Sequence, residues 1–359
     1  MDNKEQKKVE KQLDETSIGS DVEMLSEEEQ DELLRKYDPE ANTRDLNSIF
    51  RTIVYFGLLA FSIFQLYTAI FGQFTAEIQR SIHLGFALSL IFILFPAKKG
   101  LTKEKRRKIP FYDYILSLLA VGVGLYWPLN IERIAGQIGR LTDLDMAIGV
   151  IAIILTLEAA RRAVGLPITI ISTVFLAYAF LGPYFPGFLN HRGQDLKSIV
   201  RTMFYTTDGI LGTPISVSAT FIFVFLLFGA FLVKTGVGNY FNELAVALAG
   251  KLTGGPAKVA IFSSALQGTI SGSSVANVVG SGSYTIPMMK KLGYRKEFAG
   301  GVEAAASTGG QLMPPIMWAA AFLMVEFIGG ITYWEIAKAA AIPALLYFAG
   351  IWIMTHFEA

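Results

Sequence analysis

Two runs of small and hydroxyl-bearing residues interrupt an otherwise apolar chain, and they are the residues best suited to chemistry. The first is 268–277 (GTISGSSVAN) and the second is 306–315 (ASTGGQLMPP). A helix that breaks inside lipid frees backbone N–H and C=O groups, and each unsatisfied group costs several kcal/mol there. Such breaks are tolerated where they are buried in protein or line a cavity for an ion or substrate. We therefore take both runs as the candidate functional site.

The chemistry that these runs favour is the binding of a monovalent cation. Helix breaks expose carbonyl oxygens, and transporters bind Na⁺ through such unwound backbone. No carboxylate lies in either run, whereas a site for a divalent cation usually recruits Asp or Glu. The residues expected to hold Na⁺ are Ser271, Gly272, Ser273, Ser274, Asn277, Ser307, Thr308, Gly309 and Gly310. The residues expected to contact a substrate are Ser273, Asn277, Pro314 and Pro315.

Composition places the whole chain in a membrane. It is 52% hydrophobic and 17% charged, with a mean hydropathy of +0.45, whereas soluble domains carry about 25% charged residues. The net charge of +1 implies no nucleic-acid partner. The absence of cysteine excludes disulfides and thiolate chemistry. The three histidines are far apart in sequence, which favours structural roles over a metal site or catalysis.

The elements that position the two breaks are expected to be membrane-spanning helices, because apolar segments of about the required length recur along the chain. We expect an acidic, mostly disordered tail over 1–47, in which Ser26 and Glu29 fit a helical capping box. Loop 97–108 is rich in Lys and Arg, which indicates a cytoplasmic loop and hence a cytoplasmic N-terminus two spans earlier. Spans are expected at 48–72, 81–95, 112–127, 144–160, 166–181, 215–233 and 342–353. Shorter helices are expected at 196–205 and 236–252, and an external segment at 130–143.

The spacing of the breaks predicts two half-length helices followed by a discontinuous one. Residues 256–290 read as a re-entrant hairpin that turns at Ser271–Ser274, with Pro256 at the first helical position. A single long helix with a serine-rich packing face is the alternative. Residues 294–328 read as a helix broken by two glycines and two prolines, which resumes at Ile316. Glu303 precedes this break and either faces the site or pairs with a lysine. Glu158 and Arg162 are four residues apart and are expected to form a structural ion pair.

These residues resemble the fused membrane permease of the TRAP transporters, the tripartite ATP-independent periplasmic family, and most closely its TAXI type. The resemblance rests on 268–277, Ile286-Pro-Met-Met289, Gly293-Tyr294 and the run from Glu303 to Pro315. Residues 48–165 resemble the four-helix small subunit, including Leu157-Glu-Ala-Ala-Arg-Arg162 at its end. The fold that this implies is an all-α polytopic membrane protein, with the four-helix unit followed by the first half of an elevator-type transport domain over 166–359.

The resemblance implies a function in transport. Family members import small organic anions, typically carboxylates, with Na⁺ as the coupling ion and no organic cofactor, and an extracytoplasmic substrate-binding protein delivers the substrate. The expected location is the bacterial inner membrane. The hairpin tip and the broken helix correspond to the first of two sodium sites. No second serine-glycine hairpin follows, so we expect an N-terminal half whose partners include the missing C-terminal half of the permease and the lipid bilayer.

Two alternatives differ in class from a functioning permease. One is a truncated permease fragment that does not transport. The other is an intramembrane hydrolase, which would need a nucleophile motif around a serine. Thr269 stands where a Gly-x-Ser-Gly motif needs glycine, and no nearby histidine is placed to act as the base. We therefore expect no enzymatic activity.

Overall fold

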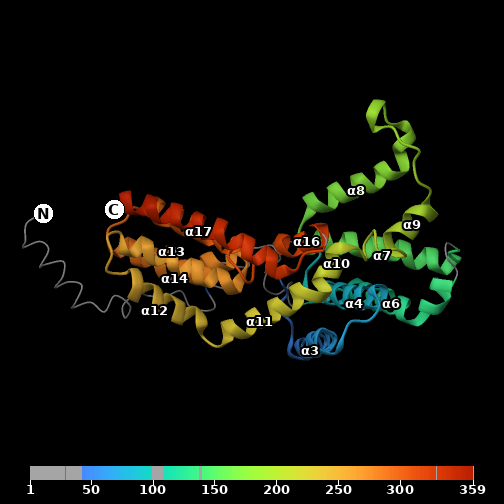
Figure 1. Ribbon diagram of the computed structural model, residues 1–359. Helices are drawn as coiled ribbons and strands as arrows, with labels where there is room; N and C mark the ends of the chain where they lie inside the picture. Colours follow the sequence, from blue (N-terminus) through green and yellow to red (C-terminus); the bar gives the residue numbers. More distant parts are fainter. Residues whose placement is uncertain (1–28, 30–42, 99–107, 137–139, 329, 359) are drawn as a thin grey trace, which may run out of the picture. The chain divides into compact units, whose positions relative to one another are not determined.

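The structure, a computed structural model, describes residues 29, 43–98, 108–136, 140–328 and 330–358, and its regular elements in these ranges are all helices (Figure 1). Six of these helices are long and apolar enough to cross a membrane. They are Ser48–Phe71, Ala76–Leu94, Phe111–Gly136, Leu166–Tyr184, Thr213–Lys234 and Tyr333–Glu358. The expectation of a helical, multi-pass chain is confirmed. The chain divides into two compact units, Asp38–Val224 and a second that contains Phe225–Ala359.

Two segments that the sequence analysis described lie largely outside the described residues. They are the acidic tail up to residue 42, which includes Ser26 of the predicted capping box, and residues 99–107 of the basic loop.

The first unit is built around α4 (Ala76–Leu94) and α6 (Phe111–Gly136), which are preceded by α3 (Ser48–Phe71). Gly85 and Gly124 allow the backbones of α4 and α6 to meet, because a Cβ placed on Gly85 would lie 2.7 Å from the Cα of Gly124. Small residues allow such close packing between membrane helices, where van der Waals contact has to replace the hydrophobic effect. The Ser81 hydroxyl, also at this contact, donates to the Gly124 carbonyl at 3.0 Å.

The fourth predicted span is the helix α7 (Asp143–Ala163), which begins with a capping box between Thr142 and Asp145. Unlike the other predicted spans it is not among the six candidate membrane helices, and its two ends carry several charged side chains. Asp145 is buried and pairs with Arg133 at 2.7 Å. Arg133 lies on α6, which continues through Pro128 to Gly136. The first part of the segment expected to be external is thus the end of α6.

The remaining elements of the first unit follow α7 along the chain. They are α8 (Leu166–Leu181), the short 3₁₀ turns η2 (Gly182–Tyr184) and η3 (Gly187–Leu189), α9 (Leu196–Phe204), and α10 (Thr213–Val217) with the π-helical turn η4 (Ser218–Ile222). The chain enters the second unit within α11 (Phe223–Lys234).

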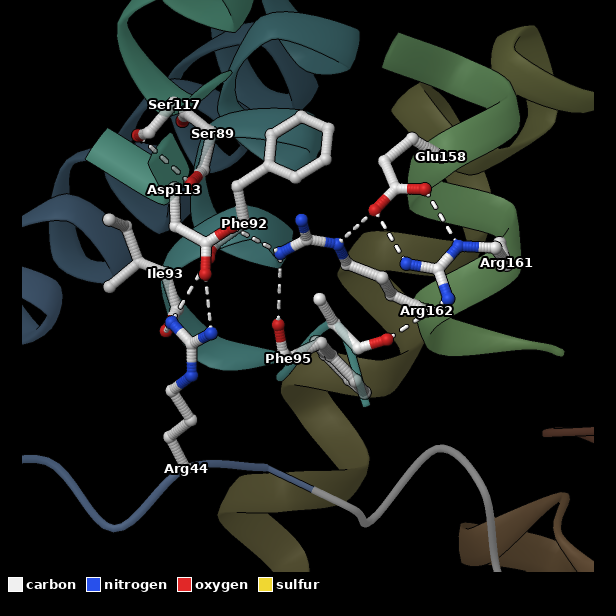
Figure 2. A network of polar contacts seen from close by, with 11 residues as sticks. Arg44, Ser89, Phe92, Ile93, Phe95, Asp113, Ser117, Glu158, Arg161 and Arg162 are labelled. Carbon is white, nitrogen blue, oxygen red and sulfur yellow. Dashed lines mark hydrogen bonds and ion pairs between the residues drawn. The ribbon is translucent and has the colours of Figure 1, made fainter. Parts of the chain in front are cut away.

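A buried ion network joins the chain before α3 to the ends of α4, α6 and α7 (Figure 2). Asp113 is fully buried and receives Arg44 at 2.5 Å and Arg162 at 2.7 Å. Arg162 also pairs with Glu158, as expected, and Glu158 binds Arg161 as well. Arg44 further donates to the carbonyls of Phe92 and Ile93. The charges here therefore act as ties between chain segments.

The second unit holds the two predicted breaks. Its helices are α12 (Val237–Ala249), α13 (Gly255–Ser271), α14 (Ser274–Lys291), α15 (Lys296–Gly309), the 3₁₀ turn η5 (Gly310–Leu312), α16 (Ala319–Ile328) and α17 (Tyr333–Glu358). α13 and α14 lie side by side, and α15 packs against both (Figure 1). α17 begins nine residues before the span expected at 342–353.

Replacement of Asp113 by alanine tests the ion network. The change leaves Arg44 without its carboxylate partner in the interior, and it removes one of the two carboxylates that bind Arg162. The loss of one partner of a buried ion pair costs about 3–5 kcal/mol. We expect the free energy of unfolding, measured by denaturant titration in mixed micelles, to fall by about that amount.

The matched control is Glu358→Gln, since the pair of Glu358 with Arg295 is exposed and 3.4 Å long. Exposed ion pairs contribute about 0–1 kcal/mol. Equal losses in the two variants would contradict the structural role given to Asp113.

Candidate functional site

The hairpin turns within two residues, Gly272 and Ser273. Gly272 ends α13 in the left-handed region at φ 58°, which glycine adopts without steric cost. A Cβ there would also lie 2.8 Å from the carbonyl oxygen of Ile316. Ser273 is the N-cap of α14, and its side chain accepts a hydrogen bond from the backbone N–H of Ala276. α13 and α14 are thus separate helices that pack against each other, so the alternative of one long helix is wrong, and the re-entrant course of the pair stays a prediction.

The helical stretch over 294–328 is also interrupted, and the interruption is longer than expected. α15 ends at Gly309, η5 follows, and α16 begins only at Ala319. The expectation that the helix resumes at Ile316 is wrong, because the Ile316 N–H donates to the carbonyl of Thr269 on α13 at 3.3 Å. The Trp318 N–H donates to the carbonyl of Gln311. The freed backbone groups of this break are thus bound across the hairpin and within the break itself.

The two breaks lie directly against each other. A Cβ on Gly268 would lie 2.4 Å from the Cα of Gly310, so the backbones of α13 and η5 are in contact. At the start of α14, after the hairpin turn, the Ser274 hydroxyl accepts a hydrogen bond from the Gln311 side chain at 3.1 Å. Gln311 was not predicted as a site residue, although its position directly after two glycines could have indicated it. The structure therefore brings the two runs into one place.

Asn277 has an unusual environment. It is 1% exposed, and its amide nitrogen donates to the carbonyl of Ser264 at 2.9 Å. Its other side-chain atom, Oδ1, is buried without a hydrogen-bond partner in the described structure. Its amide group lies beside Gly310, where a Cβ would lie 2.6 Å from Asn277 Nδ2. A buried oxygen without a partner is costly, which makes it a natural ligand for a cation.

The hydroxyl oxygens of the other residues predicted to bind the ion make different hydrogen bonds. The Ser271 hydroxyl contacts the Ser273 carbonyl at 3.5 Å, which keeps it at the turn. Ser307 is fully buried and donates to Glu303 at 2.9 Å, away from the turn residues. Thr308 is exposed and donates to the carbonyl of Ala304 on its own helix. The hydroxyl groups of Ser307 and Thr308 therefore point to different sides of α15.

Gly309, Pro314 and Pro315 lie at the edge of this arrangement. Gly309 packs beneath the ring of Tyr347, since a Cβ would lie 2.6 Å from that ring. The peptide bond between the two prolines is cis. The carbonyl of Pro315 accepts a hydrogen bond from the Tyr333 hydroxyl on α17. Both prolines are partly exposed.

Glu303 is fully buried on α15 and is held by hydroxyl groups. Its carboxylate accepts hydrogen bonds from Ser264 on α13, from Ser281 and Thr285 on α14, and from Ser307. The alternative of a lysine partner is wrong for the described residues, where hydroxyl groups hold the carboxylate. The sequence signal for this cluster was the i, i+4 spacing of Ser281 and Thr285, which places both hydroxyls on one face of α14.

Histidine and acidic residues form no metal-binding group in the ranges that the structure describes. His83 is buried and hydrogen-bonds to Gln65 and Ser218, which agrees with a structural role. His191 lies in the loop after α8, where its ring nitrogen contacts the Tyr178 carbonyl.

The contact between the two breaks can be tested with Gly268→Ala. The added methyl group has to push the backbone of Gly310 away, and overpacking of this kind typically costs about 1–3 kcal/mol. We expect a matching loss of unfolding free energy in mixed micelles.

Gly300→Ala on α15 is the control, because a Cβ there meets nothing within 4 Å. Alanine is the better helix former by about 1 kcal/mol, so this variant should be neutral or more stable. A Gly268→Ala variant as stable as Gly300→Ala would show that the two breaks are not in contact.

Comparisons with curated proteins find relatives among the permeases of TRAP transporters. The C4-dicarboxylate TRAP transporter large permease protein DctM of Vibrio cholerae is 33% identical over 168 residues, which cover 46% of this chain and 33% of that protein. The sialic acid TRAP transporter large permease protein SiaM of the same organism is 30% identical over 133 residues, 37% of this chain and 30% of that protein. The isethionate TRAP transporter permease protein DctMQ of Oleidesulfovibrio alaskensis is 37% identical over 91 residues, 25% of this chain and 14% of that protein.

The chain spans about a third or less of the length of these curated relatives. No solved structure gives a significant match. The model of the tripartite ATP-independent periplasmic transporter family, DctM component, matches residues 151–359. Because this match covers more than half of the chain and includes both breaks, the chain belongs to the DctM family of TRAP transporter permeases, as a multi-pass protein of the bacterial inner membrane and not an enzyme.

Proposed function

We propose that this chain is part of a permease that imports small organic anions, chiefly carboxylates, with Na⁺ as the coupling ion. Family membership supports the role in transport. The relatives are named for C4-dicarboxylates, sialic acid and isethionate, which are all small organic anions. An extracytoplasmic substrate-binding protein is proposed to deliver the substrate.

The observation that carries the ion site is the unpartnered Oδ1 of Asn277. It belongs to a buried residue whose amide group lies against Gly310, where the backbone of the second break begins. Oxygen ligands for Na⁺ would come from Asn277, from the turn residues Ser271 to Ser274, and from carbonyls of residues 307–310. This donor set contains no carboxylate, which suits a monovalent cation.

The electrostatics of the helix ends favour the same place. α14 begins at Ser274, and its N-terminus directs free N–H groups and the positive end of the helix dipole toward the turn. α15 ends at Gly309, and its last carbonyls carry the negative end of a dipole. A cation near the carbonyls of α15 and an anionic substrate near the N-terminus of α14 would each meet the favourable sign. Ser273, Asn277, Pro314 and Pro315 remain the proposed substrate contacts.

The proposed domain arrangement and membrane orientation also follow from the resemblance to the TRAP transporter permeases. Residues 48–165 would act as the small-subunit part of a TAXI-type fused permease, and residues 166–359 as the first of two inverted repeats. The N-terminus would be cytoplasmic, and the transport domain would move as an elevator. Uptake is proposed for a permease that contains this chain together with a second repeat, so the chain expressed alone is a useful comparison in each assay.

Asn277→Ala and Ser273→Ala should weaken the dependence of uptake on sodium. In vesicles that hold the complete permease and its binding protein, uptake of candidate acids should be faster with a Na⁺ gradient than with a K⁺ gradient. The loss of one oxygen ligand should raise the Na⁺ concentration for half-maximal uptake about tenfold, if the ligand contributes about 1–2 kcal/mol.

Thr308→Val is the matched control, because the Thr308 hydroxyl is bound to the Ala304 carbonyl and points to the exposed side of α15. It should leave the sodium requirement unchanged. Equal uptake by the parent permease with Na⁺ and K⁺ gradients would overturn sodium coupling. A normal sodium requirement in both Asn277→Ala and Ser273→Ala would overturn the location of the site.

A further inference from the structure

A cationic pocket lies in the first unit, between the end of α4 and the start of α6. It has a volume of about 390 Å³, and its walls include Arg44, Lys98, Lys108 and Tyr112. Its other walls are Ala97, Ile109 and Pro110, so three of the seven lining residues are cationic and none is acidic. Lys98 and Lys108 are both exposed. A pocket of this composition selects an anion.

The ion network behind the pocket does not cancel this charge. The network contains three arginines, Arg44, Arg161 and Arg162, against two carboxylates, Asp113 and Glu158 (Figure 2). Three positive and two negative charges leave a surplus of one, and Lys98 and Lys108 raise the surplus of this set to three.

The same network fixes the walls of the pocket. Arg161 donates to the carbonyl of Ala97 at 2.9 Å. The backbone N–H of Arg44 donates to the carbonyl of Leu94 at 2.7 Å, and its guanidinium donates to the carbonyls of Phe92 and Ile93. A site whose walls are already ordered loses little entropy when a ligand binds.

An apolar stripe leads away from the pocket along α6. Phe111, Ile115, Leu118, Leu125 and Leu129 recur at helical spacing on one face, and all are exposed. Gly122, between them, has open space around it. Since α6 is one of the candidate membrane helices, this face is available to acyl chains. The pocket lies at the end of a spanning helix, where lipid headgroups gather.

We propose that this pocket binds the phosphate headgroup of an anionic phospholipid, whose acyl chains lie along the exposed face of α6. Lys98 and Lys108 bind the phosphate, the ordered end of α4 shapes the pocket, and Tyr112 lies at the boundary between headgroup and acyl chains. Basic pockets at the ends of membrane helices bind anionic headgroups in this way, and each Lys or Arg contributes to the attraction. This assignment is independent of the ion site in the second unit.

The test measures the thermal unfolding of the detergent-solubilised chain against added lipid. Phosphatidylglycerol should raise the unfolding temperature in a saturable way, whereas phosphatidylcholine and inorganic phosphate at equal concentrations should not. The double variant Lys98→Gln, Lys108→Gln should bind phosphatidylglycerol at least about tenfold more weakly. Its unfolding temperature in phosphatidylcholine should match the parent chain, because both residues are exposed.

The matched control is Arg192→Gln, Lys197→Gln, which removes the same charge from exposed positions elsewhere in the first unit. It should respond to phosphatidylglycerol as the parent does. A photoactivatable phosphatidylglycerol should cross-link to the start of α6 in the parent chain and in this control, but only weakly in the Lys98, Lys108 variant. An equal effect of inorganic phosphate would overturn the lipid assignment in favour of a small anion, and an unchanged response of the Lys98, Lys108 variant would overturn the site.

Discussion

The second unit depends on the contact between two stretches of unwound backbone. Polar backbone groups away from water need partners, and here each break supplies them to the other. The Ile316 N–H binds the Thr269 carbonyl, and Gln311 binds Ser274. These bonds require that the two backbones touch, which Gly268 and Gly310 allow. The breaks are therefore stable as a pair, although each would be costly alone.

Buried charge is handled differently in the two units. In the first, Asp113 is neutralised by arginines that also bind helix-terminal carbonyls, so the charges hold chain ends together. In the second, Glu303 is surrounded by four hydroxyl groups from three helices. Hydroxyl groups are small enough to fit between closely packed helices, and they orient without long side chains. The Glu303 cluster thus ties the hairpin to α15.

The position of Asn277 links this packing to function. One end of its amide is fixed by the Ser264 carbonyl on the other arm of the hairpin. The opposite end keeps an unpaired oxygen beside the second break. A rigidly held but unsatisfied oxygen is prepared for a cation, because the protein has already ordered it and left it without a hydrogen bond. This is the physical basis for placing the proposed coupling ion at the contact of the breaks.

The residues alone were enough to predict the membrane class, most of the helices, both breaks and the family. These features depend on apolar length, on glycine and proline chemistry and on a long local motif, and all of them can be read along the chain. The ends of elements were less predictable, as α6, α16 and α17 show, because neighbouring segments decide where a helix stops. Ile316 is the clearest case, since its N–H bonds to Thr269 on another helix.

Only the tertiary structure decided how the candidate oxygens are used. Ser307 and Thr308 are adjacent in sequence and equal in chemistry, yet one faces Glu303 and the other faces outward. From the sequence, Glu303 could either face the site or pair with a lysine. In the structure it binds hydroxyl groups of residues 18 to 39 positions away in sequence, as well as one on its own helix. The sequence by itself determined which groups can bind an ion. The packing of α13, α14 and α15 determined which of them lie together, because the contacts between these helices join residues that are far apart in sequence.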